Sequence, residues 1–121
     1  MHYTGVDIME IGRIEEAVAQ WGERFLRRIY TDRELELYHG DSPALAVGFA
    51  GKEAVMKLLG TGVRGTGWQE IEILPDPRGK PLVHLHRRAQ ERARELGLDG
   101  LALSLSHSKE YAIACAVGGV G

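Results

Sequence analysis

The segment Phe49-Ala-Gly-Lys-Glu-Ala-Val-Met-Lys-Leu-Leu-Gly-Thr-Gly62 places a carboxylate, an amine and a glycine-flanked hydroxyl at fixed spacing. Glu53 and Lys57 are four residues apart, so on a helix they share one face. The glycines of the turn 60–62 let the backbone bend closely around Thr61. A phosphate-and-metal site needs these three functions, but an ordinary helix with a surface ion pair and a glycine C-cap shows the same pattern. Residues elsewhere in the chain must decide between the two interpretations.

Helix and strand signals extend from this segment in both directions. Thr31 with Glu34 three residues later is a capping-box pattern, and Ser42 followed by Pro43 is typical of an N-cap with proline at the first helical position. Turn residues fill 75–80 between two alternating stretches and predict a hairpin. In chain order the sequence predicts a strand at 3–8, helical segments over 11–29, helices at 32–38 and 42–59, a loop at 60–67, strands at 71–73 and 83–85, a helix at 87–96, and strands at 101–106 and 112–117.

These elements predict a single α+β domain over residues 1–121, with a small, largely antiparallel sheet packed by helices. The stretch 112–117 is almost wholly apolar, which favours a central position in its sheet. We expect 118–121 to be a frayed tail. Cys115 is the only cysteine, and its apolar neighbours predict a small buried side chain.

Bulk composition limits the classes of partner. The chain is 44% hydrophobic and 26% charged with a net charge of −2, which argues against bulk electrostatic binding to nucleic acid or to a membrane. No basic-then-apolar leader opens the sequence, and no apolar run approaches the roughly 20 residues of a spanning helix. With the lone cysteine, these features favour a cytoplasmic protein.

Asp7 ends the first predicted strand, where a carboxylate can point out of a sheet. A turn-forming or helix-capping aspartate is the simpler interpretation. Together with Glu53, however, it offers two oxygen ligands, and Mg²⁺ typically takes one or two protein carboxylates, completing its shell with water and phosphate oxygens.

Histidines give two further candidates. His107 closes the strand Ser104-Leu-Ser-His107, where it can bind a phosphate or simply occupy a turn. His84 and His86 share a strand face, but a pair without a third ligand favours solvent-facing histidines over a zinc site. No Gly-X-Ser-X-Gly elbow is present, and the glycine loop follows a helix instead of leading into one, so it is not a P-loop.

Basic and apolar side chains gather in the early helical region. Such a surface suits an acidic amphipathic helix of another protein, although nearby glutamates are equally consistent with a solvated face. The residues concerned are Arg13, Arg24, Arg27 and Arg28 beside Ile14, Trp21, Phe25 and Leu26.

Three blocks of sequence, 5–15, 49–62 and 104–117, closely resemble bacterial holo-acyl-carrier-protein synthases, which are 4′-phosphopantetheinyl transferases. The stretches 70–73 and 79–81 fit the intervening hairpin of that family. The resemblance implies the family's α+β fold and its reaction, in which the phosphopantetheine arm of coenzyme A moves to a serine of an apo acyl carrier protein, releasing adenosine 3′,5′-bisphosphate. It also implies trimers with active sites between subunits.

The resemblance also assigns roles to individual residues. It implies that Asp7 and Glu53 are catalytic magnesium ligands and that Lys57 is a catalytic residue that contacts the phosphates. It implies that coenzyme A is bound by His107 at a phosphate, by the loop of Gly60, Thr61 and Gly62 at the nucleotide, and by Pro81 near the adenine. It also implies that Arg13 and Arg24 contact the carrier protein. This chain departs from the family at Gly48, where an arginine is usual, and locally at Gly51 and Leu58.

Two other functions compete with this hypothesis. A non-catalytic module could dock an acidic protein on the arginines and sense a nucleotide with the glycine loop, and a metal-dependent phosphohydrolase would use water in place of the serine. The pair of carboxylates favours the transferase over the module, because simple binding needs no two-carboxylate metal site. The sequence leaves open a fatty-acid or polyketide carrier, the use of acyl-coenzyme A, magnesium or manganese, and the general base.

Overall fold

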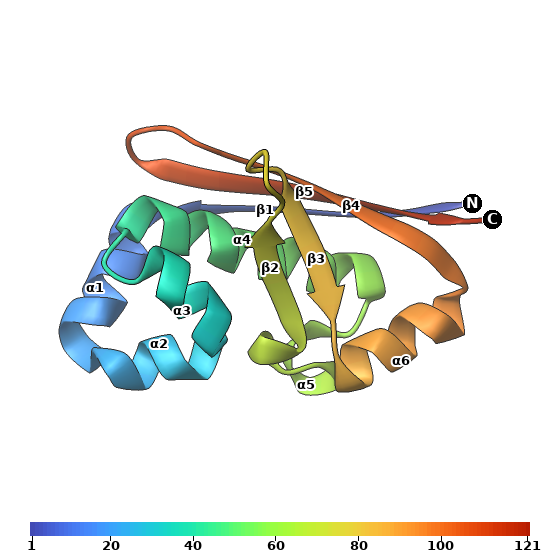
Figure 1. Cartoon of the computed structure of the whole chain (residues 1–121), viewed down its shortest axis with the longest axis horizontal. Helices are drawn as coiled ribbons and strands as arrows, with labels where there is room; N and C mark the ends of the chain where they lie inside the picture. The colour runs from blue at the N-terminus through green and yellow to red at the C-terminus, as the bar shows by residue number, and fades with distance from the viewer.

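The computed structural model describes residues 1–121 as one α+β unit with two antiparallel sheets. One sheet has three strands in the order β1-β5-β4, and the second is the hairpin β2-β3 (Figure 1). In chain order the elements are β1 (His2–Glu10), α1 (Ile11–Trp21), α2 (Glu23–Ile29), α3 (Asp32–Tyr38), α4 (Ser42–Leu59), α5 (Gly62–Gly65), the 3-10 turn η1 (Trp68–Glu70), β2 (Ile71–Pro75), β3 (Pro81–Leu85), α6 (Arg87–Leu96), β4 (Leu98–His107) and β5 (Tyr111–Val120). No helix has the length and apolar character needed to cross a membrane.

The strand β5 is central in its sheet, as its sequence predicts. Its residues alternate strictly, with Ala112, Ala114 and Ala116 buried while the residues between them are exposed. Small side chains on the inner face allow α4 to lie close beneath the sheet. Two expectations are wrong here. Residues 118–120, expected as a frayed tail, continue β5 by pairing with its neighbouring strands. Cys115, expected to be buried, is exposed, because alternate side chains of β5 point outward and Cys115 is one of them.

The helix α4 runs under the inner face of the sheet and touches β1 directly (Figure 1). A Cβ at Gly5 would overlap the carbonyl oxygen of Ala54 and lie 2.8 Å from the nitrogen of Leu58, so only glycine allows this approach. The helix is capped by Asp41, whose Oδ1 accepts from the nitrogen of Ala44 at 3.1 Å. The predicted cap was one residue later, because serine and aspartate have similar capping ability.

The helices α1, α2 and α3 form a second layer against the first half of α4, around a separate apolar cluster. The capping box at Thr31 and Glu34 that starts α3 is confirmed. The stretch 60–67 was predicted as a loop, but it contains the single helical turn α5. Glycine spacing identified the bends at Gly60 and Gly62, both with positive φ, but not the helical turn that starts at Gly62.

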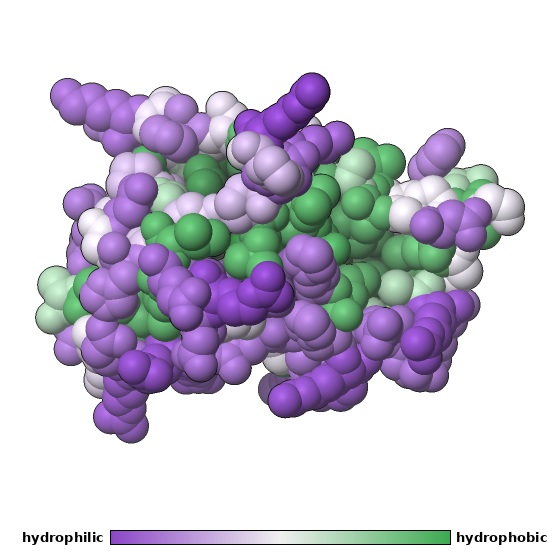
Figure 2. Space-filling view, in the orientation of Figure 1, coloured by the Kyte–Doolittle hydropathy of each residue, from purple (hydrophilic) through white to green (hydrophobic).

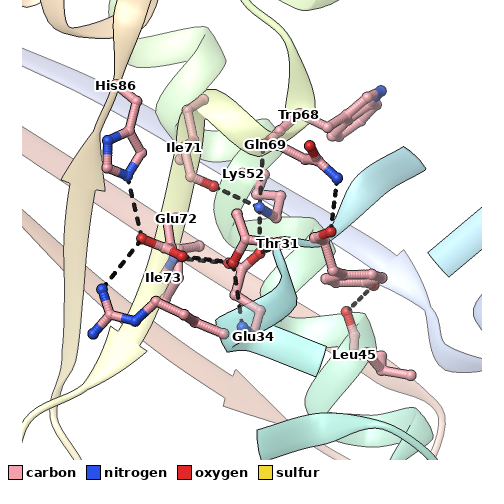
Figure 3. A network of polar contacts seen from close by, with 12 residues as sticks. Thr31, Glu34, Leu45, Lys52, Trp68, Gln69, Ile71, Glu72, Ile73 and His86 are labelled. Carbon is pink, nitrogen blue, oxygen red and sulfur yellow. Dashed lines mark hydrogen bonds and ion pairs between the residues drawn. The ribbon is translucent and has the colours of Figure 1, made fainter. Parts of the chain in front are cut away.

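A buried ion pair joins these layers (Figure 3). Lys52 is fully buried, and its ammonium donates to Oε1 of Glu34 at 2.8 Å and to the carbonyl oxygen of Trp68 at 3.1 Å. Burial lowers the pKa of Lys52, and the charge of Glu34 opposes that shift. The other oxygen of Glu34 accepts from the nitrogen of Ile73 at 2.8 Å, so one pair connects α3, α4, η1 and β2.

Candidate functional site

Asp7 and Glu53 line a single cavity of about 440 Å³ at the junction of β1, α1 and α4. The two carboxylates are 46 residues apart in the chain and are brought together because β1 packs directly on α4. The other lining residues are Ile8, Met9, Glu10, Arg13, Phe49 and Tyr111. The tertiary structure therefore places both acids in the lining of one cavity.

Asp7 occupies a different position in its strand from the one predicted. The strand continues to Glu10, because β1 keeps pairing with β5 as far as Tyr111. Asp7 faces inward toward α4 instead of lying at a strand end, and its side chain is only 16% exposed. This position fixes the carboxylate more firmly than a turn would.

The charges in the cavity interact. Burial raises the pKa of Glu53, the negative charge of Asp7 raises it further, and Lys57 opposes both. The ammonium of Lys57 lies 3.1 Å from Oδ1 of Asp7 and 3.0 Å from the carbonyl oxygen of Val6. A pair of carboxylates that repel one another is a natural cation site, because a divalent ion relieves the repulsion.

The carboxylate ligands available in this cavity suit a hard metal ion that keeps part of its hydration shell. No group of three or more metal-binding side chains exists anywhere in the structure. Asp7 and Glu53 could supply the one or two carboxylates that Mg²⁺ typically takes from a protein, and water and phosphate oxygens would complete its coordination. His86 contacts the carboxylate of Glu72 at 3.2 Å.

The glycine loop begins one turn after Lys57. Gly60 ends α4 in the left-handed conformation with φ 72°, and Gly62 follows with φ 62°. The hydroxyl of Thr61 lies 3.1 Å from that of Thr66, so the loop closes on itself through two side chains. The loop does not line the acid cavity of this chain.

Pro81 and His107 lie away from the two acids. Pro81 lines a smaller hollow of about 180 Å³ together with Gly48 and Leu105. His107 ends β4 and is exposed, and β5 separates that strand from β1. In one chain the predicted site therefore has an acidic part, Asp7 and Glu53, and a nucleotide part, Pro81 and His107, that does not line the cavity of the acids.

The two predicted carrier contacts also separate. Arg13 lines the acid cavity itself. Arg24 lines a hollow of about 440 Å³ on α1 and α2 with Trp21, Phe25 and Arg28. The side chains of Trp21 and of the two arginines are exposed there, so the hollow combines an aromatic surface with two positive charges.

Sequence reasoning missed some residues of the acid cavity, notably Phe49, Glu10 and Tyr111. Glu10 and Tyr111 are directly opposite one another in the register of β1 and β5. Strand register was the signal that could have found them, but it depends on the long-range pairing of the two ends of the chain.

Comparison with known proteins identifies the family. A family model described as the 4′-phosphopantetheinyl transferase superfamily matches residues 3–116. The chain belongs to this superfamily. A holo-[acyl-carrier-protein] synthase of Herpetosiphon aurantiacus is 47% identical over 125 residues, covering 98% of each chain, and one of Dehalococcoides mccartyi is 50% identical over 117 residues, covering 97% of this chain and 98% of the relative.

Solved structures of the superfamily agree with this result. A Helicobacter pylori holo-[acyl-carrier-protein] synthase in complex with coenzyme A superimposes with a TM-score of 0.87 at 32% identity, covering 96% of this chain and 99% of that one. The Neisseria meningitidis synthase gives a TM-score of 0.89 at 31% identity, covering 97% of both chains. The superfamily, the transferase class and the α+β fold predicted from the sequence are confirmed.

Proposed function

We propose that this transferase moves the 4′-phosphopantetheine group of coenzyme A to a serine of an apo acyl carrier protein, releasing adenosine 3′,5′-bisphosphate. The observation that carries the proposal is the shared cavity of Asp7 and Glu53, with Lys57 beside them. The names of the relatives specify the acceptor, and the Helicobacter structure contains the donor.

Asp7 and Glu53 would hold a magnesium ion, which when bound offsets the negative charge of the pyrophosphate and of the reacting oxygens. Glu53, whose pKa is raised by burial and by Asp7, would accept the proton of the serine hydroxyl. The serine oxygen forms a bond to the β-phosphorus, and the bond from that phosphorus to the bridging oxygen breaks. Lys57 contacts the phosphates and stabilises the leaving nucleotide.

The nucleotide end of the donor is held by the Gly60–Gly62 loop, Pro81 and His107. In one chain Pro81 and His107 lie apart from the acids, so a complete site requires a second subunit. The outer face of the sheet β1-β5-β4 supports such an assembly. Val6, Ile8 and Ile113 are exposed by 55%, 62% and 42%, and such a contiguous apolar surface favours burial. We propose a homotrimer in which neighbouring chains contribute the two parts of each site.

The acceptor docks along α1 and α2. Arg13, at the acid cavity, and Arg24, in the neighbouring hollow, would attract an acidic helix of the carrier toward the reacting phosphorus. Trp21 and Phe25 offer it an apolar contact. This arrangement delivers the acceptor serine to the edge of the cavity where Asp7 and Glu53 lie.

A carrier-modification assay tests the proposal. The chain is incubated with an apo acyl carrier protein, coenzyme A and Mg²⁺, and intact mass spectrometry follows the gain of one phosphopantetheine. Asp7→Asn and Glu53→Gln should each lower the rate about 100-fold or more, because several kcal/mol of charge stabilisation are lost. Glu36→Gln, an exposed change on α3 outside the cavity and the docking helices, serves as the control and should leave the rate unchanged.

Two results would reject the proposal. One is full activity of either carboxylate variant. The other is binding of coenzyme A by the wild-type chain without transfer to any acyl carrier protein, which would favour a binding module.

A further inference from the structure

A second polar cleft lies between α2, η1 and α6, outside the site described above. Its volume is about 540 Å³, and only one of its lining residues is hydrophobic. In Figure 2 the lower edge of the molecule, where α2 and α6 lie, is hydrophilic. The lining residues of this α6 cleft are Arg28, Thr31, Gly67, Trp68, Gln69, Glu70, His86, Arg87 and Gln90.

Three side chains that line the α6 cleft are fixed by internal contacts (Figure 3). Gln69 donates to the carbonyl oxygen of Tyr30 at 2.9 Å, and Thr31 donates to Oε2 of Glu72 at 2.6 Å. His86 contacts the other oxygen of Glu72 at 3.2 Å. These three side chains do not need to be reordered when a ligand arrives, which lowers the entropy cost of binding.

The one carboxylate that lines the cleft is already neutralised. Glu70 accepts from Arg88 at 2.9 Å and from the nitrogen of Gly67 at 2.7 Å. Burial by itself raises the pKa of Glu70, but these hydrogen bonds and the charge of Arg88 outweigh it and lower the pKa. The cleft therefore presents no free negative charge of its own.

The positive charges of the α6 cleft are free. Arg28 and Arg87 are exposed, and neither has an ion-pair partner within 4.0 Å, whereas nearby Arg27, Arg33 and Arg88 are all paired. Two unpaired guanidinium groups in a walled cleft suit carboxylates, which they can bind with two hydrogen bonds each.

Arg28 lines the α6 cleft and also the hollow of Trp21, Arg24 and Phe25. The two depressions thus share one side chain, and the strip that they make up together extends from α1 to α6. The first part is aromatic and basic and the second is polar and basic. A partner that crosses both needs an amphipathic helix followed by further acidic side chains.

We propose that the α6 cleft is a second docking surface for the acidic carrier protein, in which Arg28 and Arg87 bind carboxylates that lie beyond the carrier's docking helix. The inference rests on the proposed carrier docking at Arg24. Charge complementarity selects this partner, because the strip is basic throughout and a mostly polar cleft offers little surface to an apolar ligand.

Steady-state transfer with charge-reversal variants tests this inference. Arg87→Glu should raise the KM for the carrier about tenfold, with kcat at saturating carrier and the KM for coenzyme A unchanged. Arg87→Gln should raise it less and should weaken the dependence of KM on salt. Arg94→Glu, an exposed change of equal charge on the same helix, is the matched control and should stay within twofold of wild type. Circular dichroism verifies that each variant is folded.

The outcomes separate this inference from the function on which it rests. If Arg24→Glu raises the KM for the carrier but Arg87→Glu does not, docking ends at α2 and the second surface is rejected while the proposed function stands. If Arg87→Glu changes the KM for coenzyme A alone, the cleft binds nucleotide, and the inference is overturned. If the wild-type chain transfers nothing, the proposed function itself fails.

Discussion

The ammonium of Lys57 on α4 lies 3.1 Å from the carboxylate of Asp7 on β1, and this ion pair spans 50 positions of sequence. The side chain of Lys57 is 55% exposed, so the ion pair contributes at most about 1 kcal/mol to stability. The ion pair therefore contributes little to folding, and the proposed role of Lys57 in the transfer reaction can be tested separately from stability.

Replacing Lys57 separates these two contributions. We expect Lys57→Met to lower kcat for transfer about 100-fold, since a charge that stabilises the leaving phosphate is lost, while the urea midpoint changes little. Lys57→Arg, which keeps the charge, should retain more of the rate. A Met variant with wild-type kcat would show that Lys57 only balances the charge of Asp7.

Replacing Gly5 and Gly48 by alanine should have opposite effects on the free energy of unfolding. Gly5→Ala should destabilise the fold by about 3 kcal/mol or more, because the new methyl group overlaps the backbone of α4 at Ala54. Gly48→Ala should stabilise it by about 0.5–1 kcal/mol, since this glycine lies inside α4 and its added Cβ would lie 3.7 Å from the ring of Tyr30. Urea denaturation measures both. Equal effects would contradict the close packing of β1 on α4.

The buried pair of Lys52 and Glu34 predicts non-additive mutations. Lys52→Met should cost about 3–5 kcal/mol, because it leaves the carboxylate of Glu34 buried without its cation. Adding Glu34→Gln removes that charge and should recover at least about 1 kcal/mol. A double-mutant cycle by chemical denaturation checks this. Simple addition of the two single effects would mean that the charges are not coupled.

Protonation of the Glu72 carboxylate in acid should lower the stability of the fold. Burial alone raises the pKa of Glu72, but hydrogen bonds from Thr31 and His86 and the charge of Arg33 outweigh it, so the pKa is lower than its ordinary value of 4.5. The unfolded state then binds the proton more readily than the folded state. Stability from this group is present above pH 4.5 and is lost as pH falls through the folded-state pKa.

The measurement for Glu72 compares Tm at neutral pH and in acid. Glu72→Gln should be less stable than wild type at neutral pH and should lose less of its Tm in acid. Parallel curves for the two proteins would show that other carboxylates account for the acid sensitivity.

The outer face of the three-stranded sheet predicts an oligomer. Ile113→Glu should leave the subunit folded, because this side chain is already 42% exposed, but should disrupt the proposed trimer. Light scattering should give about three chain masses for wild type and one for the variant. Val63→Glu, an exposed change in α5, is the control. The thiol of Cys115, on the same face, should react with a thiol reagent faster in the Ile113→Glu variant than in wild type.

Much of the local structure follows from neighbouring residues. The helices α3, α4 and α6 lie where caps and periodicity predict them, because capping and amphipathic patterns act within a few residues. The blocks at 5–15, 49–62 and 104–117 also identified the superfamily, which the family model confirms. The pairing that extends β1 past Asp7 was not predictable locally, since its partner β5 is at the other end of the chain.

Sequence alone predicted the helices α3, α4 and α6, the central place of β5 and the superfamily, since these depend on short-range patterns and on blocks of sequence that resemble one family. Tertiary structure alone decided that Asp7 and Glu53 share a cavity while Pro81 and His107 do not lie in it, that Cys115 faces outward, and that Arg28 joins two basic depressions. The physical reason is that these relations depend on strand register and on the close approach of β1 to α4, which are set by contacts between residues far apart in the chain.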